Sequence, residues 1–291
     1  MTKSTKAHPR LSSRLGALSL LTIALIFGTS AAPATAAIPQ RWVASHSAAD
    51  YVALGDSFTS GQGAPPYLSG PCLQSKYASY PVITAALSSY KLVANESCSG
   101  ANTAAVLAQL GQLPSRLVRA SSPVRLVTLT VGGIDAGSNR VLAACAPDPA
   151  SAACLAAIAF TTGQLTSADL GQGLAATYWA VANAMPHARV VVLAYPRLFN
   201  PGLSPLGDTV NSATDTLNAI ITGAAASVAA QGKNVRVVDV TQEFENHGIC
   251  ARLPYISFDP SNLLAQANMH PNVLGNSLGY FRALLNDRVL S

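Results

Sequence analysis

From Asp50 onward, short runs of apolar and β-branched residues alternate with longer alanine-rich segments. Most of the short runs are continuously apolar, which is typical of parallel strands covered on both faces. The runs expected to form strands are Tyr51–Leu54, Lys91–Ala94, Arg125–Val131, Arg189–Ala194 and Val235–Val240. The segments expected to form helices are Pro81–Ser88, Thr103–Leu113, Leu170–Ala184, Thr209–Ala230 and Leu274–Arg288. This order predicts an α/β fold, a three-layer α/β/α sandwich around a five-stranded parallel sheet.

The first 36 residues have a different pattern. Four bases and no acid precede the apolar run Leu15–Gly28, and small residues continue from there to Ala36. This is typical of a secretory signal peptide cleaved after Ala36, and the 14-residue apolar run is short for a membrane span. Because no linker or repeat divides the rest, we expect one domain over residues 37–291 of a secreted, extracellular protein without stable membrane insertion.

Composition and charge exclude several classes of protein. With 49% hydrophobic and 11% charged residues, the chain is not a disordered polyelectrolyte. Its 18 Lys and Arg against 13 Asp and Glu give a net charge of +5, but four of the bases lie in the expected signal peptide. The mature chain is therefore close to neutral, and no nucleic-acid partner is expected.

All five cysteines lie in the expected mature chain, where the compartment is oxidising. Cys145 and Cys154 flank a proline-containing run and could bridge, and Cys72 with Cys98 is the next most plausible pair. Cys250 is left without a partner. Since no C-x-x-C and no zinc-ligand spacing occurs, neither a metal site nor a cofactor is expected.

A candidate nucleophile follows the first predicted strand. The run Tyr51–Leu54 ends in Gly55-Asp56-Ser57, and a polar, glycine-containing stretch comes next. In open parallel sheets, ligands bind beyond the carboxyl ends of the strands. The Ser57 hydroxyl could therefore face a substrate carbonyl, although a serine at this position could equally cap the next helix.

A candidate base lies near the C-terminus. His270 stands just before a predicted helix, which places it at the same end of the sheet as Ser57. A histidine with a pKa near 6.5 can accept a serine proton at neutral pH. His247 is the competing base, whereas His46 and His187 lie in unstructured-looking or helix-end positions.

Four blocks in this sequence resemble those of the GDSL esterases and lipases, also called SGNH hydrolases. The blocks are Gly55–Gly61, Cys98–Thr103, Val131–Asp135 and His270–Gly275, and they span about 220 residues in the family's order. The likeness is strongest to the secreted actinobacterial branch of lipases, esterases and phospholipases A1. It implies a flavodoxin-like fold and a secreted hydrolase of carboxylic esters.

The resemblance also implies a role for individual residues. Ser57 would be the nucleophile and His270 the general base, acting through an acyl-enzyme. The backbone N–H groups of Ser57 and Gly100 would form the oxyanion hole, and a residue without Cβ at position 100 lets the backbone approach the oxygen.

This chain departs from the family in the third block. Ile134 stands where the family has an asparagine whose side-chain amide donates to the oxyanion. Loss of one such donor typically costs ~10²–10³ in turnover. Asn102 or Asn139 could substitute for it, and Asp135 is expected to cap the helix that follows.

A second departure concerns the group that orients the histidine. Ala267 replaces the usual aspartate three residues before His270. Some members of the branch use a main-chain carbonyl two residues upstream, here that of Asn268, which would give a Ser–His dyad. Asp259 is the alternative acid.

The branch commonly carries three disulfides. Cys72–Cys98 and Cys145–Cys154 match the first two in order and spacing, whereas the third would need a partner for Cys250 near position 200, where this chain has no cysteine. The likeness therefore implies a free Cys250.

The expected substrates are esters with lipid acyl chains. The protein is expected to be a monomer. Residues Pro65–Leu68 could line an acyl groove or form a surface loop, and Ser138–Ala168 is expected to be a loop-and-helix excursion beside the active face. Two alternatives stay open. The chain could be a lipid- or glycan-binding protein with a weakened site, which Ile134 favours, or a polysaccharide acetyl esterase, for which two tryptophans offer no obvious sugar platform.

Overall fold

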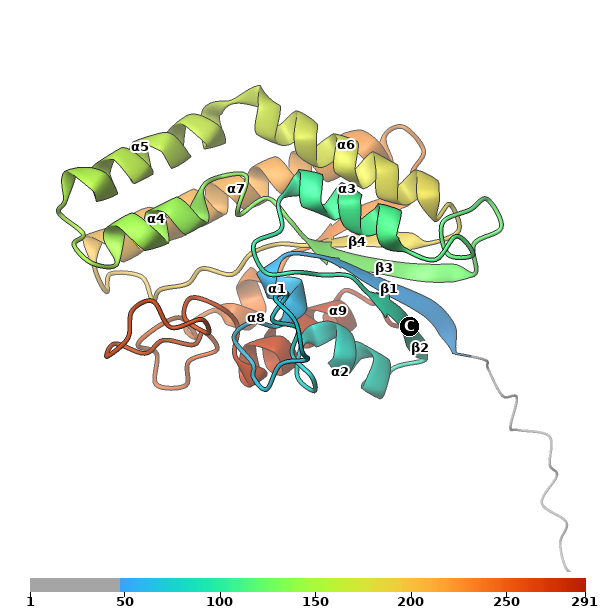
Figure 1. Ribbon diagram of the computed structural model, residues 1–291, viewed down its shortest axis with the longest axis horizontal. Coiled ribbons are helices and arrows are strands. Elements are labelled where there is room, and N and C mark those ends of the chain that lie inside the picture. The colour runs from blue at the N-terminus through green and yellow to red at the C-terminus, as the bar shows by residue number, and fades with distance from the viewer. Residues whose placement is uncertain (1–47) are drawn as a thin grey trace, which may run out of the picture. The chain divides into compact units, whose positions relative to one another are not determined.

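Five parallel strands form the centre of the part of the chain described by a computed structural model, residues 48–291 (Figure 1). The expected signal peptide, its cleavage site and His46 lie outside the described residues. The strand order in the sheet is β2-β1-β3-β4-β5, and all neighbouring strands are parallel. The strands are β1 (Ala49–Gly55), β2 (Tyr90–Asn95), β3 (Val124–Thr130), β4 (Arg189–Leu193) and β5 (Val235–Val238).

Helices cover both faces of the sheet, which confirms the predicted three-layer sandwich (Figure 1). On one face lie α3 (Thr103–Gln112), α4 (Ser138–Cys145), α5 (Ala152–Thr166), α6 (Ala168–Ala184) and α7 (Pro205–Ala229). On the other lie α2 (Tyr80–Leu87), α8 (Thr241–Phe244), the π-helix η1 (Gly275–Phe281) and α9 (Arg282–Asn286). The short helix α1 (Ser57–Ser60) follows β1. No helix among these described residues is both long and apolar enough to cross a membrane.

The continuously apolar strands serve two cores. Along β1, Val52 and Leu54 pack in the core shared with α3, α6 and α7, whereas Tyr51 and Ala53 pack in the core shared with α2, α8 and η1. Successive side chains of a strand point to opposite faces, so a strand buried on both faces needs apolar residues throughout.

The structure differs from the predicted elements at their ends. The last expected helix divides into η1 and α9. The helix expected from Thr209 begins four residues earlier, because the Ser204 side chain caps it by accepting from the Gly207 N–H at 3.0 Å and Pro205 starts its first turn. The excursion over Ser138–Ala168 contains two helices, α4 and α5, joined by the Cys145–Cys154 disulfide.

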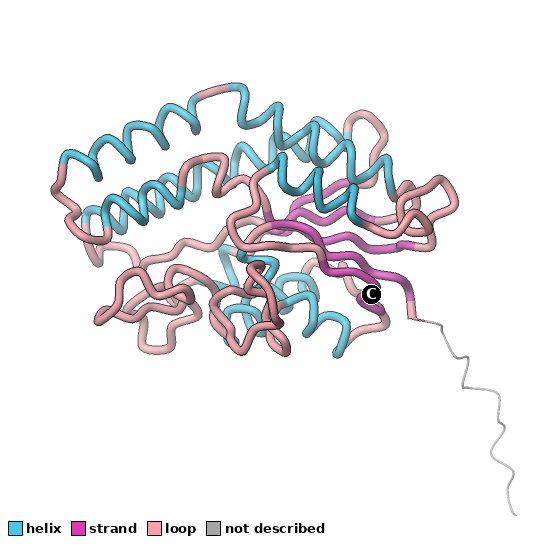
Figure 2. Tube along the Cα trace, in the orientation of Figure 1, coloured by secondary structure: helices cyan, strands magenta, loops and turns pink. Residues whose placement is uncertain are grey.

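Two loops meet where the strands end. The loop after α1 and the loop between α8 and η1 gather at the carboxyl ends of the strands (Figure 2). Gln62 donates through Nε2 to the Gln266 carbonyl at 2.6 Å, and the Ser257 hydroxyl donates to the Gly63 carbonyl at 3.0 Å. These bonds join the segment that carries Ser57 to the segment that carries His270.

Candidate active site

The turn between β1 and α1 fixes the position of Ser57. Gly55 has a φ of +119°, and a Cβ on it would lie 2.4 Å from the Thr130 carbonyl oxygen, so only glycine fits this turn. Asp56 caps α1 by accepting from the Phe58 N–H at 3.0 Å. Ser57 then opens the helix with 7% of its surface exposed. The helix cap considered for Ser57 is supplied by Asp56 instead.

The structure brings Ser57 and His270 together although 213 residues separate them. Ser57 Oγ lies 2.8 Å from His270 Nε2. His270 Nδ1 lies 2.7 Å from the Asn268 carbonyl oxygen, which can only accept. Nδ1 therefore carries the ring proton, and the lone pair of Nε2 faces the serine hydroxyl.

Backbone pairing holds the histidine loop. The Met269 N–H donates to the Ser257 carbonyl at 2.9 Å, and the Ser257 N–H donates to the His270 carbonyl at 2.8 Å. Met269 has a φ of +62°, a conformation that few residues other than glycine adopt. This conformation lies between the carbonyl of Asn268 and the ring of His270, the two groups that hydrogen-bond to each other.

The Asn268 side chain ties the same loop internally. Its Oδ1 accepts from the Asp259 N–H at 2.7 Å, and its Nδ2 donates to the Asn262 carbonyl at 2.9 Å. The side chain is buried, so these bonds satisfy polar atoms that water does not reach.

The alternative acid, Asp259, does not reach the histidine. Its carboxylate accepts from the Ser261 N–H at 2.9 Å and from the Ser261 hydroxyl at 2.6 Å, and these bonds lower its pKa. The side chain is exposed and forms a local turn. Within the described residues, the group bonded to His270 Nδ1 is the neutral carbonyl of Asn268.

Burial sets the basicity of His270. Removal from water lowers its pKa to about 4, and the hydrogen bond to Asn268 offsets this only in part. The Phe58 ring lies against the imidazole, with ring centroids 5.1 Å apart. The ring is therefore neutral at neutral pH and able to accept a proton.

The backbone N–H groups of Ser57 and Gly100 are candidates for binding an anion beside the serine. Gly100 has a φ of +78°, and neither its N–H nor that of Ser57 donates to an acceptor among residues 48–291. Both residues line the same cavity. An exposed glycine with a free N–H next to the nucleophile suits an oxyanion hole.

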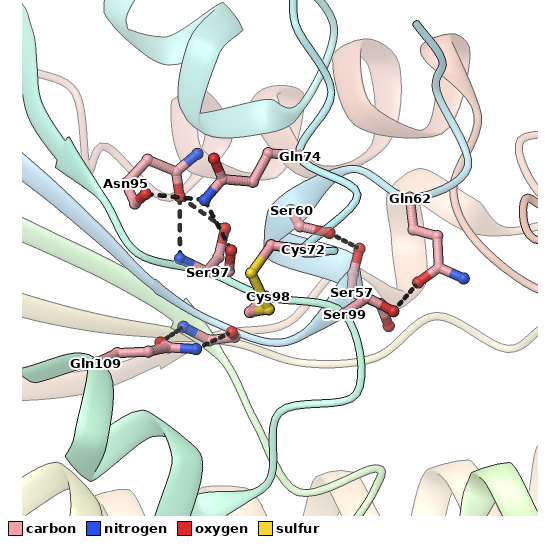
Figure 3. Close-up of a disulfide and its surroundings, with 11 residues drawn as sticks. Ser57, Ser60, Gln62, Cys72, Gln74, Asn95, Ser97, Cys98, Ser99 and Gln109 are labelled. Carbon is pink, nitrogen blue, oxygen red and sulfur yellow. Dashed lines mark hydrogen bonds between the residues drawn. A yellow bond between two sulfur atoms is a disulfide. The ribbon is translucent and has the colours of Figure 1, made fainter. Parts of the chain in front are cut away.

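Amides and a disulfide hold the Gly100 loop against β1. The Cys98 N–H donates to the Gly55 carbonyl at 2.9 Å, and Cys98 is bonded to Cys72. Figure 3 shows this disulfide near the Ser99 hydroxyl, which donates to Gln62 Oε1 at 2.6 Å. Figure 3 also shows Gln109, whose amide pairs with both the N–H and the carbonyl of Gly55. The glutamines were not predicted from the sequence, because nothing in their local pattern marks them.

The third block supplies no side-chain amide at its family position. Ile134 lines the cavity wall and has no donor. Asn102 accepts from the Ala105 N–H at 2.9 Å as the cap of α3 and does not line the cavity, whereas Asn139 lines it but is exposed.

Asp135 was expected to cap the helix that follows it, and this was wrong. Its carboxylate accepts from the Thr103 hydroxyl at 2.7 Å and from the Thr103 N–H, at the start of α3.

A buried network of hydrogen bonds supports the turn that carries Ser57. The Asp56 carboxylate, 2% exposed, accepts from the Thr130 hydroxyl at 2.5 Å and from the Tyr195 hydroxyl. Tyr195 in turn accepts from the Gly133 N–H at 3.1 Å. Burial raises the pKa of Asp56 to about 6, and the bonds from Thr130 and Tyr195 partly offset this. The network links the turn of Ser57 to the third block.

The cavity that starts at Ser57 and His270 has a volume of about 380 Å³. It extends between α4, α5 and α7, where its walls are mostly apolar. Residues Pro65–Leu68 do not line it, so the groove is not where the sequence suggested. Helix α7, the segment after β4 and the α4–α5 excursion form it instead.

The remaining candidates lie elsewhere. The His247 ring stacks on Tyr255 with centroids 3.8 Å apart, and its Nδ1 lies 2.8 Å from the Leu253 carbonyl oxygen. Neither His247 nor His187 lines the cavity. Cys250 is exposed and unpaired within residues 48–291, and no group of three or more potential metal ligands occurs there.

Comparisons with known proteins identify the family of this chain. The model of the GDSL-like lipase/acylhydrolase family matches residues 53–278. Lipase 1 of Streptomyces coelicolor is 36% identical over 266 residues, which cover 88% of this chain and 91% of that protein.

Two solved structures share the fold over almost their whole length. The extracellular lipase of Streptomyces rimosus is 34% identical with a TM-score of 0.69, and the match covers 82% of this chain and 99% of that one. Phospholipase A1 of Streptomyces albidoflavus is 33% identical with a TM-score of 0.67 and the same coverage of both chains. The resemblance seen in the four sequence blocks is thereby confirmed: the chain belongs to the GDSL-like lipase/acylhydrolase family of ester hydrolases.

Proposed function

We propose that Ser57 and His270 form a catalytic dyad that hydrolyses carboxylic esters through an acyl-enzyme. The observation that carries this proposal is the 2.8 Å distance between Ser57 Oγ and His270 Nε2 at the mouth of an apolar cavity. The Asn268 carbonyl orients the ring, and the N–H groups of Ser57 and Gly100 bind the oxyanion.

The first half-reaction transfers the acyl group to the enzyme. Ser57 Oγ attacks the ester carbonyl carbon while its proton passes to His270 Nε2. The carbonyl oxygen becomes an oxyanion that accepts from the two backbone N–H groups. The carbon–oxygen bond to the alcohol then breaks, and Nε2 returns the proton to the leaving oxygen. The acyl group is left on Ser57 as an ester.

The second half-reaction repeats these steps with water. His270 takes a proton from water, the hydroxide attacks the acyl carbon, and Nε2 protonates Ser57 Oγ as the carboxylic acid leaves. A neutral carbonyl behind the ring stabilises the imidazolium less than a carboxylate does. Together with the missing amide at Ile134, this predicts a slower enzyme than a family member with both groups.

The cavity favours acyl chains over sugars. A substrate with a long hydrocarbon chain gains from an apolar cavity next to the nucleophile, whereas an acetylated polysaccharide needs a polar platform. Membership of a hydrolase family and the neutral His270 beside Ser57 also favour an enzyme over a binding protein that has lost activity. We therefore propose lipid acyl esters as substrates.

We also propose that residues 1–36 are a signal peptide and that residues 37–291 act outside the cell. The basic and apolar pattern of the N-terminus supports export, as do the two disulfides. The Streptomyces rimosus relative is described as extracellular. N-terminal sequencing of protein recovered from the culture medium is expected to begin at Ala37, and retention of the full chain in cells would overturn export. Light scattering on the same material tests the predicted monomer.

Fluorophosphonate labelling tests the dyad directly, because only an activated serine reacts fast. We expect labelling and hydrolysis of p-nitrophenyl esters by the wild type, and a loss of about 10⁴-fold or more in kcat for Ser57→Ala and His270→Ala. The matched controls Ser115→Ala and His187→Ala change exposed residues outside the cavity and are expected to retain activity. Equal rates for Ser57→Ala and the wild type, or a folded wild type that does not label, would refute the assignment.

A further inference from the structure

A second cavity adjoins the one that contains Ser57. It has a volume of about 290 Å³ and lies between α5 and α7. The two cavities share five lining residues: Val141, Thr161, Leu165, Val210 and Ala213. These side chains from three helices form the junction between the cavities. Ala213 is the smallest of them, so its position leaves the most room for a ligand to pass.

The path from Ser57 to the junction is apolar. Beyond the polar mouth, the first cavity is lined by Ile134, Leu142, Leu165, Leu198, Phe199 and Leu217. Burial of a hydrocarbon chain against such walls is favourable. A charged or sugar ligand would lose its hydrogen bonds to water there without replacing them.

The second cavity contains several threonines, but most of their hydroxyls need no ligand. The hydroxyls of Thr162 and Thr166 donate to carbonyls four residues earlier in α5, each at 3.0 Å. Those of Thr209 and Thr216 do the same in α7, at 2.8 and 3.0 Å. Hydroxyls satisfied by their own helix leave a wall that tolerates hydrocarbon.

The outer wall of both cavities is fixed in place. The Cys145–Cys154 disulfide joins α4 to α5. The Arg140 guanidinium lies over the Phe160 ring, 4.1 Å from its centroid, and thereby joins the two helices a second time. A wall held by two such links presents a largely preformed site.

We propose that the substrate's acyl chain runs from Ser57 between α4 and α7 to this junction, and that Ala213 determines how long a chain the enzyme accepts. The proposal rests on the proposed function of Ser57. Short chains end within the first cavity, and longer chains pass Ala213 into the second. Each methylene buried along this path is expected to raise kcat/KM by roughly fourfold until the chain no longer fits.

The test is a chain-length series on Ala213→Phe, with Ala213→Leu as a milder variant and thermal unfolding as a check of the fold. Ala219→Phe is the matched control, because Ala219 is exposed on the same helix and lines neither cavity. We expect Ala213→Phe to lower kcat/KM for palmitate esters about tenfold or more relative to butanoate esters. Ala219→Phe is expected to leave the ratio unchanged. An unchanged ratio in a folded Ala213→Phe would overturn the role of Ala213.

A binding measurement separates this inference from the proposed function. In the Ser57→Ala variant, calorimetry with saturated fatty acids is expected to show affinity that rises with chain length, and the further substitution Ala213→Phe is expected to remove the gain for the long chains. If no ester is hydrolysed but this dependence is found, the proposed catalysis fails and the acyl path stands. If esters are hydrolysed but neither rates nor binding depend on Ala213, the path fails alone.

Discussion

The two halves of the Ser57–His270 pair are held in different ways. On the serine side, the turn after β1 is fixed by buried side chains, among them the charged Asp56, the hydroxyl of Tyr195 and the amide of Gln109. On the histidine side, a loop with exposed leucines is fixed by backbone pairing and by the neutral side chain of Asn268. Ser57 is thus built into the core, whereas His270 lies on a loop at the edge of the core.

The two sides also differ in whether a charged group contacts them. A buried carboxylate that accepts three hydrogen bonds supports Ser57 from below, and no carboxylate among the described residues contacts the imidazole of His270. The serine side depends on hydrogen bonds to a buried carboxylate, where loss of one hydrogen-bond partner costs more free energy than it would in water. The histidine side depends on geometry, because a carbonyl can fix a tautomer without adding charge.

The largest effect is expected from breaking the serine side. Asp56→Asn leaves the Tyr195 and Thr130 hydroxyls facing an amide that can accept fewer bonds. We expect a loss of about 2–3 kcal/mol in the free energy of unfolding in urea. We also expect a fall of about 10² in kcat, since the turn of Ser57 and the Gly133 segment move relative to each other.

The control for this change is Asp215→Asn. Asp215 pairs with Arg197 at 2.7 Å on the surface, where a lost ion pair costs about 0–1 kcal/mol. If Asp56→Asn is no more destabilising than Asp215→Asn, the Asp56 network does not support the site.

A smaller effect, in the opposite direction, is expected at the oxyanion site between the two halves. Ile134→Asn restores the family's side-chain donor at the cavity wall, and an additional oxyanion donor is expected to raise kcat about tenfold or more. The measurement is kcat on a short p-nitrophenyl ester, with Ile134→Leu as an apolar control that is expected to bring no gain. No increase from Ile134→Asn would mean that another group already fills this role.

The smallest effect concerns the pH profile of the histidine side. Burial without a carboxylate holds the pKa of His270 at about 4, well below the usual value. The proposed base works only when neutral, but the wild type also carries Asp56, whose pKa burial raises to about 6. In the Asp56→Asn variant, where that carboxyl is absent, activity is therefore expected to stay within about twofold between pH 7 and pH 5 and to fall tenfold per pH unit below the pKa of His270. Hydrolysis is followed by chromatography of the released acid, with Ser57→Ala as the blank. An inflection near pH 6.5 in the Asp56→Asn variant would show that the His270 ring is solvated in the working enzyme.

The sheet and the residues at its edge could be predicted from the sequence because both depend on local pattern. Continuous apolar runs predict buried parallel strands, and a glycine followed by Asp56 and Ser57 marks where the first strand ends. His270 was found from its position before a predicted helix and Gly100 through its family block, and both lie at the cavity with Ser57. The two disulfide pairs in the structure are likewise those that the spacing favoured.

The sequence could not show which partner each polar group bonds. The sequence offered both the Asn268 carbonyl and Asp259 as partners of His270, and only the folded loop shows Asp259 turned to Ser261. Asp135 accepts from Thr103 at the start of α3, beside the cap Asn102, rather than capping the helix after it, because the start of α3 lies nearest to it in space.

What the amino-acid sequence by itself determined is the family, the sheet and the two side chains proposed to react. These follow from periodicity and from short motifs whose residues are neighbours along the chain. The tertiary structure alone decided where the cavity lies, because its walls come from α4, α5 and α7, whose packing no local pattern records. It also decided which neutral group faces His270, because that depends on how one loop closes on itself.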